Sequence, residues 1–313
     1  VKTADPTSVF EGGIGNQLVT YTYQLTNTSL AGIFDPISGI SISDTDGIPV
    51  YVGGDNGNHL LEQGETWIYT LTATMPVQDA GTLHTNTVIA EGFDDENNLT
   101  SDQDTAEVTY QDHIPASIKI MKTHTGTLNE GTSNQILVYS YTVFDDEYVP
   151  TDPTKVISLV DDVIGDILPN FIAANGNSDI LQPGGSVTFT VNYNAPMANA
   201  GNIIVNTVSV IGEDNEHNLM KANASDSAIY KDLLPSIDIQ KSHTGSLNEG
   251  TDGQVLIYSF TVSNNSTAST DPITISSLSD SVLGNLLPAF MTANGGSAVI
   301  APNTSVTFSV NYN

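Results

Sequence analysis

The sequence of 313 residues contains no cysteine, and its basic residues are seven lysines with no arginine. Without thiols, no disulfide can stabilise the chain and no cysteine can serve as a nucleophile or a metal ligand. The lysines face 36 acidic residues, which gives a formal net charge of −29. Because nucleic-acid phosphates require basic partners, we expect no nucleic acid to bind and expect cations to be natural partners. A solvated surface in a salty medium would account for the same charge.

Catalytic motifs and long apolar runs are also absent. No run of residues is long and apolar enough to cross a membrane, so we expect no membrane insertion within this segment. The six histidines do not have metal-ligand spacing, and neither a GxSxG elbow nor a phosphate-cradling glycine loop occurs. We therefore expect no catalytic residues and no enzyme in this chain.

What the chain does have is a repeat. The phrase KTHTGTLNEG, which begins at Lys122, returns as KSHTGSLNEG at Lys241, and Glu11, Glu130 and Glu249 follow one another at intervals of 119 residues. Such a period is too long for a solenoid unit and fits tandem whole domains. We predict repeats over residues 1–113, 114–233 and 234–313. The last is incomplete, because Asn313 corresponds to Asn194 of repeat two.

Period-two alternation of Val, Ile, Thr, Tyr and Phe dominates each repeat, as in QLVTYTYQLTN and SVTFTVNYNAP. This pattern predicts β-strands, and clusters such as GGDNGN and LQPGGS predict the turns between them. We expect an all-β chain of tandem immunoglobulin-like β-sandwich domains. Pro115 and Pro235 would stiffen short linkers and give an extended rod. The stretches VIGDILPNF and VLGNLLPAF are expected to form one helical turn at most.

The order of these motifs resembles a known family. The elements TAD, YTY, LTN, the strand TWIYTLTATMP and NTV, in that order, are similar to the immunoglobulin-like "conserved repeat" domains of large bacterial and archaeal surface proteins and adhesins. The resemblance covers repeats one and two and the front of repeat three. It implies an extracellular or cell-surface location and a spacer role in an adhesin stalk or filament. It also implies that internal Lys–Asn isopeptide bonds are possible in such domains.

The recurring lysine has an unusual position in the strand pattern. Ile118, Ile120 and Lys122 alternate along one strand, so the lysine is predicted to share the inward face of the two isoleucines. The same counting places Asp161 inward with Ile157 and Leu159, and places one asparagine inward on a later strand. The candidates are Lys2, Asp44 and Asn86 in repeat one, Lys122, Asp161 and Asn206 in repeat two, and Lys241 and Asp280 in repeat three.

Two interpretations of these residues remain open. The first is a buried, hydrogen-bonded Lys–Asp ion pair with the asparagine assisting, which adds little net stability although breaking it is costly. The second is an autocatalytic isopeptide bond between lysine and asparagine, which requires a neutral lysine and an acid that shuttles protons. In repeat three, the asparagine would lie beyond Asn313.

Calcium is the one cofactor that the sequence suggests. The equivalent stretches GFDDENN and GEDNEHN carry oxygen ligands of the kind that Ca²⁺ prefers, with spacing unlike that of an EF-hand loop. The candidate ligands are Asp94, Asp95, Glu96, Asp214 and Glu216. A hairpin turn with solvated charge is the alternative interpretation.

Three functions are compatible with these features. A structural rod at the cell exterior is favoured by near-equal repeats and by a single tryptophan, Trp67, whose strand position predicts a core residue. Its partners would be neighbouring repeats or chains of the same protein, and the host or surface ligand is unknown. The alternatives are an array that binds a ligand or glycan, and an ancillary region of a secreted enzyme.

Overall fold

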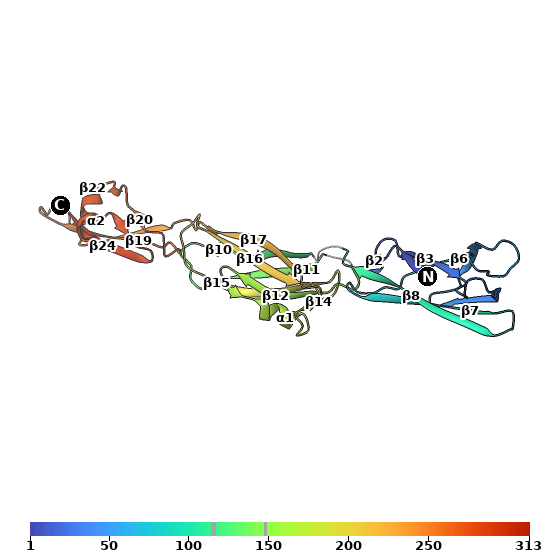
Figure 1. The fold of residues 1–313 in the computed structure, drawn as a ribbon. Helices are drawn as coiled ribbons and strands as arrows, with labels where there is room; N and C mark the ends of the chain where they lie inside the picture. Colours follow the sequence, from blue (N-terminus) through green and yellow to red (C-terminus); the bar gives the residue numbers. More distant parts are fainter. Residues whose placement is uncertain (114–116, 147–148) are drawn as a thin grey trace.

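The computed structural model describes residues 1–113, 117–146 and 149–313 of the chain. It is an all-β protein, with 54% of residues in strands and 6% in helices, which confirms the predicted fold class. Three β-rich lobes follow one another along an elongated molecule (Figure 1). The proposed linker residue Pro115 lies outside the described residues.

Repeat one consists of two sheets that pack around a core containing Val19, Tyr21 and Val108. In spatial order, the first sheet contains β1 (Lys2–Asp5), β3 (Leu18–Thr26), β6 (Thr66–Thr74) and β5 (Val50–Gly53). The second contains β2 (Ser8–Phe10), β8 (Leu99–Gln111), β7 (Leu83–Phe93) and β4 (Ser38–Asp44). The pairing is antiparallel except between β2 and β8. A short 3₁₀ helix, η1 (Glu11–Gly13), follows β2.

Repeat two has the same plan. One sheet contains β9 (Ile118–Thr125), β11 (Gln135–Asp145) and β15 (Ser186–Ala195). The other contains β10 (Leu128–Asn129), β17 (Leu219–Lys231), β16 (Ile203–Glu213), β12 (Thr154–Asp161), β13 (Gly165–Asp166) and, on β12, β14 (Ile180–Leu181). Buried residues alternate along β11, where Leu137, Tyr139 and Tyr141 have no exposed surface. This is the predicted period of two, and it places these side chains between the sheets.

Repeat three contains one complete sheet, with β18 (Ile237–Thr244), β19 (Leu256–Asn264) and β24 (Thr304–Tyr312). Two short pairs lie beside it: β20 (Ile273–Thr274) with β23 (Val299–Ile300), and β21 (Ser279–Asp280) with β22 (Gly284–Asn285). Every residue of β18 is exposed, including Ile237 and Ile239. The prediction that Lys241 lies on a buried face is therefore wrong, since no strands equivalent to β16 and β17 cover β18 in the described chain.

Two further expectations are corrected. The stretches expected to form a single turn instead form the seven-residue helices α1 (Leu168–Ala174) and α2 (Leu287–Ala293), each with a proline at its second residue and one buried phenylalanine. Ile157 is exposed, whereas Val156 is buried, because the pairing of β12 with β16 shifts register between Val156 and Ser158. A β-bulge of this kind reverses the alternation that simple counting assumes.

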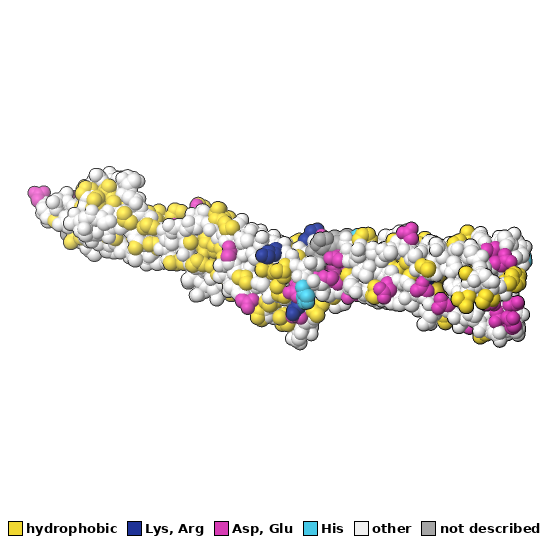
Figure 2. All heavy atoms as spheres, viewed as in Figure 1, with side chains coloured by type: hydrophobic (Ala, Val, Ile, Leu, Met, Phe, Trp, Pro, Cys, Tyr) yellow, Lys and Arg dark blue, Asp and Glu magenta, His cyan; other side chains and the backbone are white. Residues whose placement is uncertain are grey.

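Trp67 lies in β6 with 7% of its surface exposed, and its ring contacts Tyr51 edge-on. It is a largely buried residue, as the sequence predicts. In the described part of the chain, neither helix has the length and apolar character needed to cross a membrane. Acidic side chains are scattered along one face of the molecule, and they gather most densely on repeat one (Figure 2).

Candidate functional site

The recurring lysines of repeats one and two each form a buried ion pair. Lys2 Nζ of β1 lies 2.8 Å from Asp44 Oδ2 of β4. Lys122 Nζ of β9 lies 2.5 Å from Asp161 Oδ2 of β12. None of the four side chains has exposed surface, so each pair links the two sheets within the core. The structure thus brings these predicted residues together.

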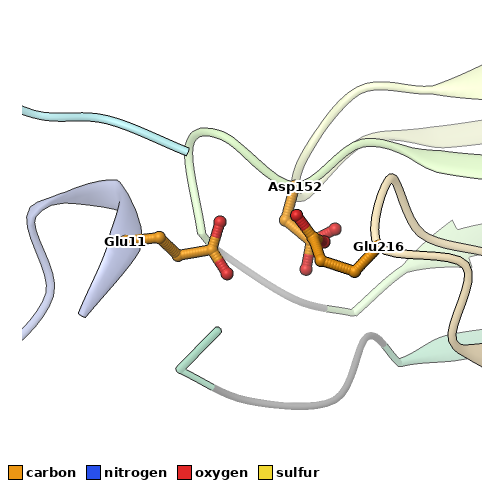
Figure 3. Close-up of side chains that lie close together, drawn as sticks. All are labelled: Glu11, Asp152 and Glu216. Atoms are coloured by element: carbon orange, nitrogen blue, oxygen red, sulfur yellow. The ribbon is translucent and has the colours of Figure 1, made fainter. Parts of the chain in front are cut away.

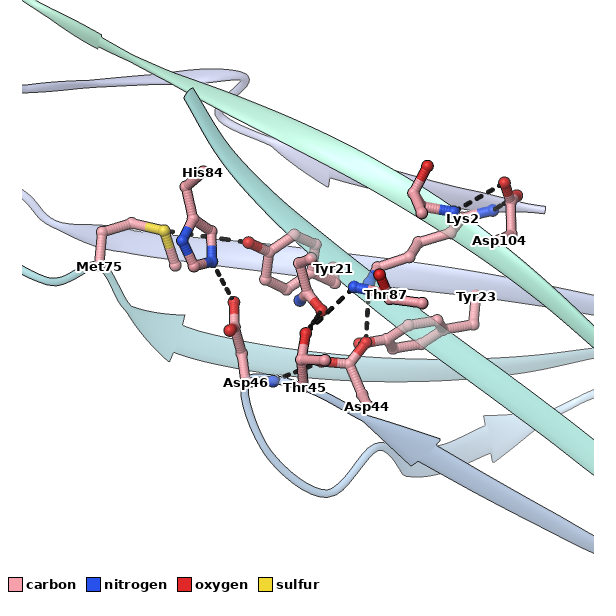
Figure 4. Close-up of polar contacts among 12 residues, drawn as sticks. Lys2, Tyr21, Tyr23, Asp44, Thr45, Asp46, Met75, His84, Thr87 and Asp104 are labelled. Atoms are coloured by element: carbon pink, nitrogen blue, oxygen red, sulfur yellow. Dashed lines mark hydrogen bonds and ion pairs between the residues drawn. The ribbon is translucent and has the colours of Figure 1, made fainter. Parts of the chain in front are cut away.

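Aromatic rings enclose both pairs. Tyr23 donates a hydrogen bond to Asp44 at 2.8 Å, and Tyr141 donates the equivalent bond to Asp161 at 2.6 Å. The Lys122 ammonium lies 4.6 Å from the centroid of the Tyr139 ring, which is a cation–π distance. Figure 4 shows the arrangement in repeat one, where the Lys2 side chain reaches Asp44 beside Tyr23.

Burial and hydrogen bonding act in opposite directions on this pair. Burial lowers the pKa of Lys122, although the bond to Asp161 opposes that shift. Burial alone would raise the pKa of Asp161, but hydrogen bonds from Lys122, Tyr141 and two backbone N–H groups outweigh it and the pKa is lowered. A hydrogen bond of 2.5 Å joins Lys122 Nζ to Asp161 Oδ2. Transfer of one proton along it yields the neutral amine.

The predicted asparagines are fully buried in both complete repeats. Asn206 of β16 and Asn86 of β7 have no exposed surface. The Asn86 Oδ1 accepts a hydrogen bond of 2.6 Å from Thr45, whereas its Nδ2 has no partner of good geometry, although the amide lies beside Tyr21 and Asp44. For Asn206, neither Oδ1 nor Nδ2 has a partner of good geometry, although the amide lies beside the Tyr139 hydroxyl. An unsatisfied buried amide is costly and calls for an explanation.

Strand register brings each asparagine toward its lysine. Asn206 is paired with Asp226 of β17, and Asp226 Oδ2 lies 2.6 Å from Nδ1 of His124. His124 is two residues beyond Lys122 on β9 and therefore points to the same face. In repeat one, Asn86 bonds to Thr45, the residue that follows Asp44. Lysine, aspartate and asparagine thus occupy one region of each complete core.

Repeat three has only two members of this set. Lys241 Nζ lies 2.5 Å from Asp280 Oδ2, and 39% of the lysine side chain is exposed. The Lys241 ammonium lies 4.4 Å from the Tyr258 ring centroid, as in the complete repeats. Hydrogen bonds from Lys241 and from the backbone of Val282 and Leu283 lower the pKa of Asp280 to about 2.

The predicted metal ligands fall into three groups. Asp94 and Asp214 cap the turns of their own hairpins, where each accepts hydrogen bonds from the backbone and the side chain of an asparagine four residues later. Asp95 and Glu96 lie beside Asp35 at the outer end of repeat one, and both are exposed. The structure therefore does not gather the five candidates of the two loops into two complete sites.

Glu216 lies elsewhere, with two residues that were not among the candidates. Its carboxylate meets those of Glu11 and Asp152 where repeat one contacts repeat two, and the oxygens lie within 4.8 Å of one another (Figure 3). Burial and the surrounding negative charges raise the pKa of Asp152 to about 7 and that of Glu216 to about 7. A second cluster, Glu130, Asp232 and Asp271, lies at the next junction.

Comparison with known proteins identifies no family for the chain. No protein-family model matches the sequence, and no match to a curated protein was found. Among solved structures, similarity extends to the C-terminal domain of the Streptococcus pyogenes antigen I/II-family protein AspA, with 9% identity over 74% of this chain and 98% of that one and a TM-score of 0.19.

Two other solved structures are similar to the same limited degree. A tetra-tandem repeat in the extending region of a large adhesion protein shows 16% identity over 99% of this chain and 65% of that one, with a TM-score of 0.21. The major pilin subunit BcpA of Bacillus cereus shows 8% identity over 93% and 95% of the two chains, with a TM-score of 0.21. TM-scores this low do not assign a function to the chain.

Proposed function

We propose that the chain is a non-catalytic, load-bearing segment of an extracellular surface protein, such as an adhesin stalk or filament. Each complete repeat is cross-linked by a Lys–Asn isopeptide bond, and calcium stabilises the rod. The observation that supports this most strongly is the buried Lys122–Asp161 pair beside an Asn206 amide without hydrogen-bond partners.

The chemistry of the bond follows from the arrangement. Lys122 transfers a proton to Asp161, and the resulting neutral Nζ attacks Cγ of Asn206. The protonated Asp161 polarises the amide and then supplies the proton with which the former Nδ2 leaves as ammonia. The attacking nitrogen gives its second proton back to the Asp161 carboxylate, so that Asp161 ends the reaction protonated. One C–N bond forms, one breaks, and no oxidant is required. Proximity within a rigid core lowers the barrier. Lys2, Asp44 and Asn86 are assigned the same roles in repeat one.

The strand topology suits a segment under tension. β10 and β17, which lie near the beginning and the end of repeat two, pair in parallel, with Leu128 opposite Tyr230. β2 and β8 do the same in repeat one. Force along the rod would load such parallel terminal strands in shear, so that several hydrogen bonds must break together. A bond from β9 to β16 would add a covalent link between the early and late parts of the repeat.

Intact-mass measurement tests the proposal. We expect the mass of the whole chain to be lower than that of the unmodified sequence by one ammonia for each complete repeat. Lys122→Met is expected to reduce the mass deficit by one ammonia, whereas Lys119→Met is expected to leave the deficit unchanged. Lys119 is the matched control, because it lies on the same strand but pairs with Asp146 at the surface. An unmodified mass for the parent chain would leave only the buried ion pair.

A further inference from the structure

The two junctions between repeats are built in the same way. At the first, Thr151 of repeat two donates a hydrogen bond of 2.9 Å to Glu11 Oε2 of repeat one. At the second, Thr270 donates a bond of 3.3 Å to Glu130 Oε2. In each case the residue after the threonine is an aspartate, Asp152 or Asp271, whose carboxylate joins the glutamate in a cluster. The junctions therefore bring together a glutamate from one repeat and an aspartate from the next.

Glycine allows this close approach. Gly12 and Gly131 directly follow the two glutamates and have φ values of +62° and +58°. A Cβ at Gly12 would lie 2.6 Å from the Val149 side chain, and one at Gly131 would collide with the backbone of Ser269. Both clashes are with the next repeat, so each glycine permits direct backbone packing across a junction. The recurring Glu–Gly pair is thus an interface element.

The first cluster contains buried carboxylate oxygens without hydrogen-bond partners. Asp152 is 1% exposed, and its Oδ1 is buried with no hydrogen-bond partner among the described residues. Oε1 of Glu11 and Oε2 of Glu216 are likewise buried and unpartnered. Figure 3 shows the Glu11 side chain directed from its own repeat toward those of Asp152 and Glu216. Each of the three groups thus contributes one buried oxygen atom without a hydrogen-bond partner among the described residues.

Among the described residues, the charged groups nearest in effect to Asp152 are acidic. The charged groups that act most strongly on Asp152 are Asp214, Glu11, Glu216 and Asp145, all of them acidic. Unpaired negative charge in a buried position is costly, and a chain with only seven lysines has few means of neutralising it. A bound cation would remove this cost and would supply the missing partner of each oxygen.

The second junction carries a corresponding cluster. Asp271 Oδ2 is buried without a partner and lies within 4.8 Å of carboxylate oxygens of Glu130 and Asp232. Glu130 itself is more fully bonded, since its Oε1 accepts from the Leu233 backbone and its Oε2 from the Ala200 backbone. The third carboxylate of this cluster belongs to Asp232, in the linker that follows β17. At the first junction it belongs to Glu216, in the hairpin between β16 and β17.

The outer end of repeat one provides an internal comparison. Asp35 occupies the position of Asp152 and Asp271 in its repeat and clusters with Asp95 and Glu96. No glutamate loop of another repeat packs there in the described chain, and Asp95 and Glu96 are exposed. Acidic residues alone therefore do not create the buried, unpartnered oxygens found at the first junction.

We infer that each junction binds one Ca²⁺, held by Glu11, Asp152 and Glu216 at the first and by Glu130, Asp232 and Asp271 at the second. Ca²⁺ takes six to eight oxygen ligands in flexible geometry, so water molecules would complete the coordination that the three carboxylates of each cluster begin. Zn²⁺ would be expected to use nitrogen or sulfur ligands, which these clusters do not offer. The inference deepens the calcium part of the proposed rod function.

The ion would connect the repeats mechanically. At each junction, the ligands come from both sides of the boundary, so binding is coupled to the angle between two repeats. Without Ca²⁺, repulsion among the carboxylates favours bending or separation of the lobes. With Ca²⁺, the same groups attract one another through the ion, and the rod stiffens. Calcium thereby controls the reach of the segment.

Isothermal titration calorimetry of the chelator-treated, dialysed chain with CaCl₂ tests the assignment. We expect one binding event for each junction. Asp152→Asn and Asp271→Asn are each expected to remove one event, and Asp35→Asn to remove none. Absence of calcium binding, full stoichiometry in either junction variant, or an equal loss with Asp35→Asn would overturn the inference.

The melting temperature, measured with and without calcium, distinguishes loss of a binding site from misfolding of the variant. In excess chelator, Asp152→Asn is expected to raise the melting temperature, because it removes a repelling charge, while in CaCl₂ it is expected to melt below the parent chain. The same sign of effect in both conditions would contradict the inference. Failure here would leave the ammonia deficit of the complete repeats unaffected, so that the cross-linked rod would remain as proposed.

Discussion

Thr151 donates its hydroxyl to Glu11 across the boundary between two repeats, at an oxygen–oxygen distance of 2.9 Å. The two residues lie 140 positions apart in the chain, yet Thr270 and Glu130 repeat the contact with the same separation. Since both boundaries carry this contact and both place a glycine beside the glutamate, the geometry of the junction is encoded in the repeat itself. Neighbouring repeats therefore contact each other directly and are not joined by the linker alone.

A glycine substitution separates this interface from backbone strain. Gly131→Ala is expected to loosen the second junction, because the new Cβ would collide with the backbone of Ser269. Gly250→Ala is the matched control. It occupies the same repeat position with φ at +72°, but nothing lies within 4 Å of its Cβ. Both variants carry the cost of a left-handed alanine, about 1–2 kcal/mol.

Small-angle scattering and urea unfolding together give the measurement. The control is expected to keep the maximum dimension and flexibility of the parent chain, and Gly131→Ala to show a more flexible rod. Scattering profiles that are identical for the two variants would show that close packing at Gly131 does not set the junction.

Much of the fold follows from the sequence because alternation along a strand is a local property. The pattern of Ile118, Ile120 and Lys122 predicts the buried face of β9, and the structure confirms it. Counting fails at Ile157, where a bulge in β12 shifts the register between the strands. That shift depends on the pairing with β16, which the sequence of β12 alone does not reveal.

The helices α1 and α2 were underestimated for a different reason. Each is only seven residues long and has a proline at its second residue, Pro169 or Pro288. A proline in the first turn of a helix is tolerated, since the N–H that it lacks has no intrahelical partner there. Burial of Phe171 and Phe290 in the cores then stabilises helices that would not persist alone.

The junction clusters were missed because their members are distant in sequence. Glu11 and Glu130 recur in Glu–Gly pairs, and Asp152 and Asp271 recur in Asp–Pro pairs, each at the repeat interval. Both signals are visible in the sequence. What is not visible is that the two motifs lie at opposite ends of a repeat and therefore meet only across a boundary. That relationship requires the topology of the sandwich.

Asp280 gives a prediction for pH dependence. Its pKa in the folded chain is lowered to about 2, chiefly by the hydrogen bond from Lys241, whereas an unperturbed aspartate titrates near about 3.9. A depressed folded pKa means that the contribution to stability is present above the unfolded value and is lost as the pH falls through about 4 to 2.

Carbon-13 NMR titration of the Asp280 carboxyl should show a midpoint near 2. The urea midpoint for repeat three should fall over the same acidic range, and Asp280→Asn should flatten that part of the profile. A carboxyl midpoint at the ordinary aspartate value would mean that the hydrogen bond from the partly exposed Lys241 to Asp280 does not persist in solution.

Asn206→Ala and Asp161→Ala distinguish the covalent bond from the ion pair that prepares it. Asn206→Ala removes the electrophile but keeps the Lys122–Asp161 contact, so it should abolish one ammonia loss and cost about 2–4 kcal/mol, as loss of a cross-link does. Asp161→Ala removes the proton shuttle and also leaves a buried ammonium without its partner. It should abolish the same ammonia loss and cost more, because breaking a buried pair alone costs about 3–5 kcal/mol. Intact mass and urea unfolding check both. If Asn206→Ala leaves both the mass deficit and the unfolding midpoint of repeat two unchanged, Asn206 is not the partner of Lys122.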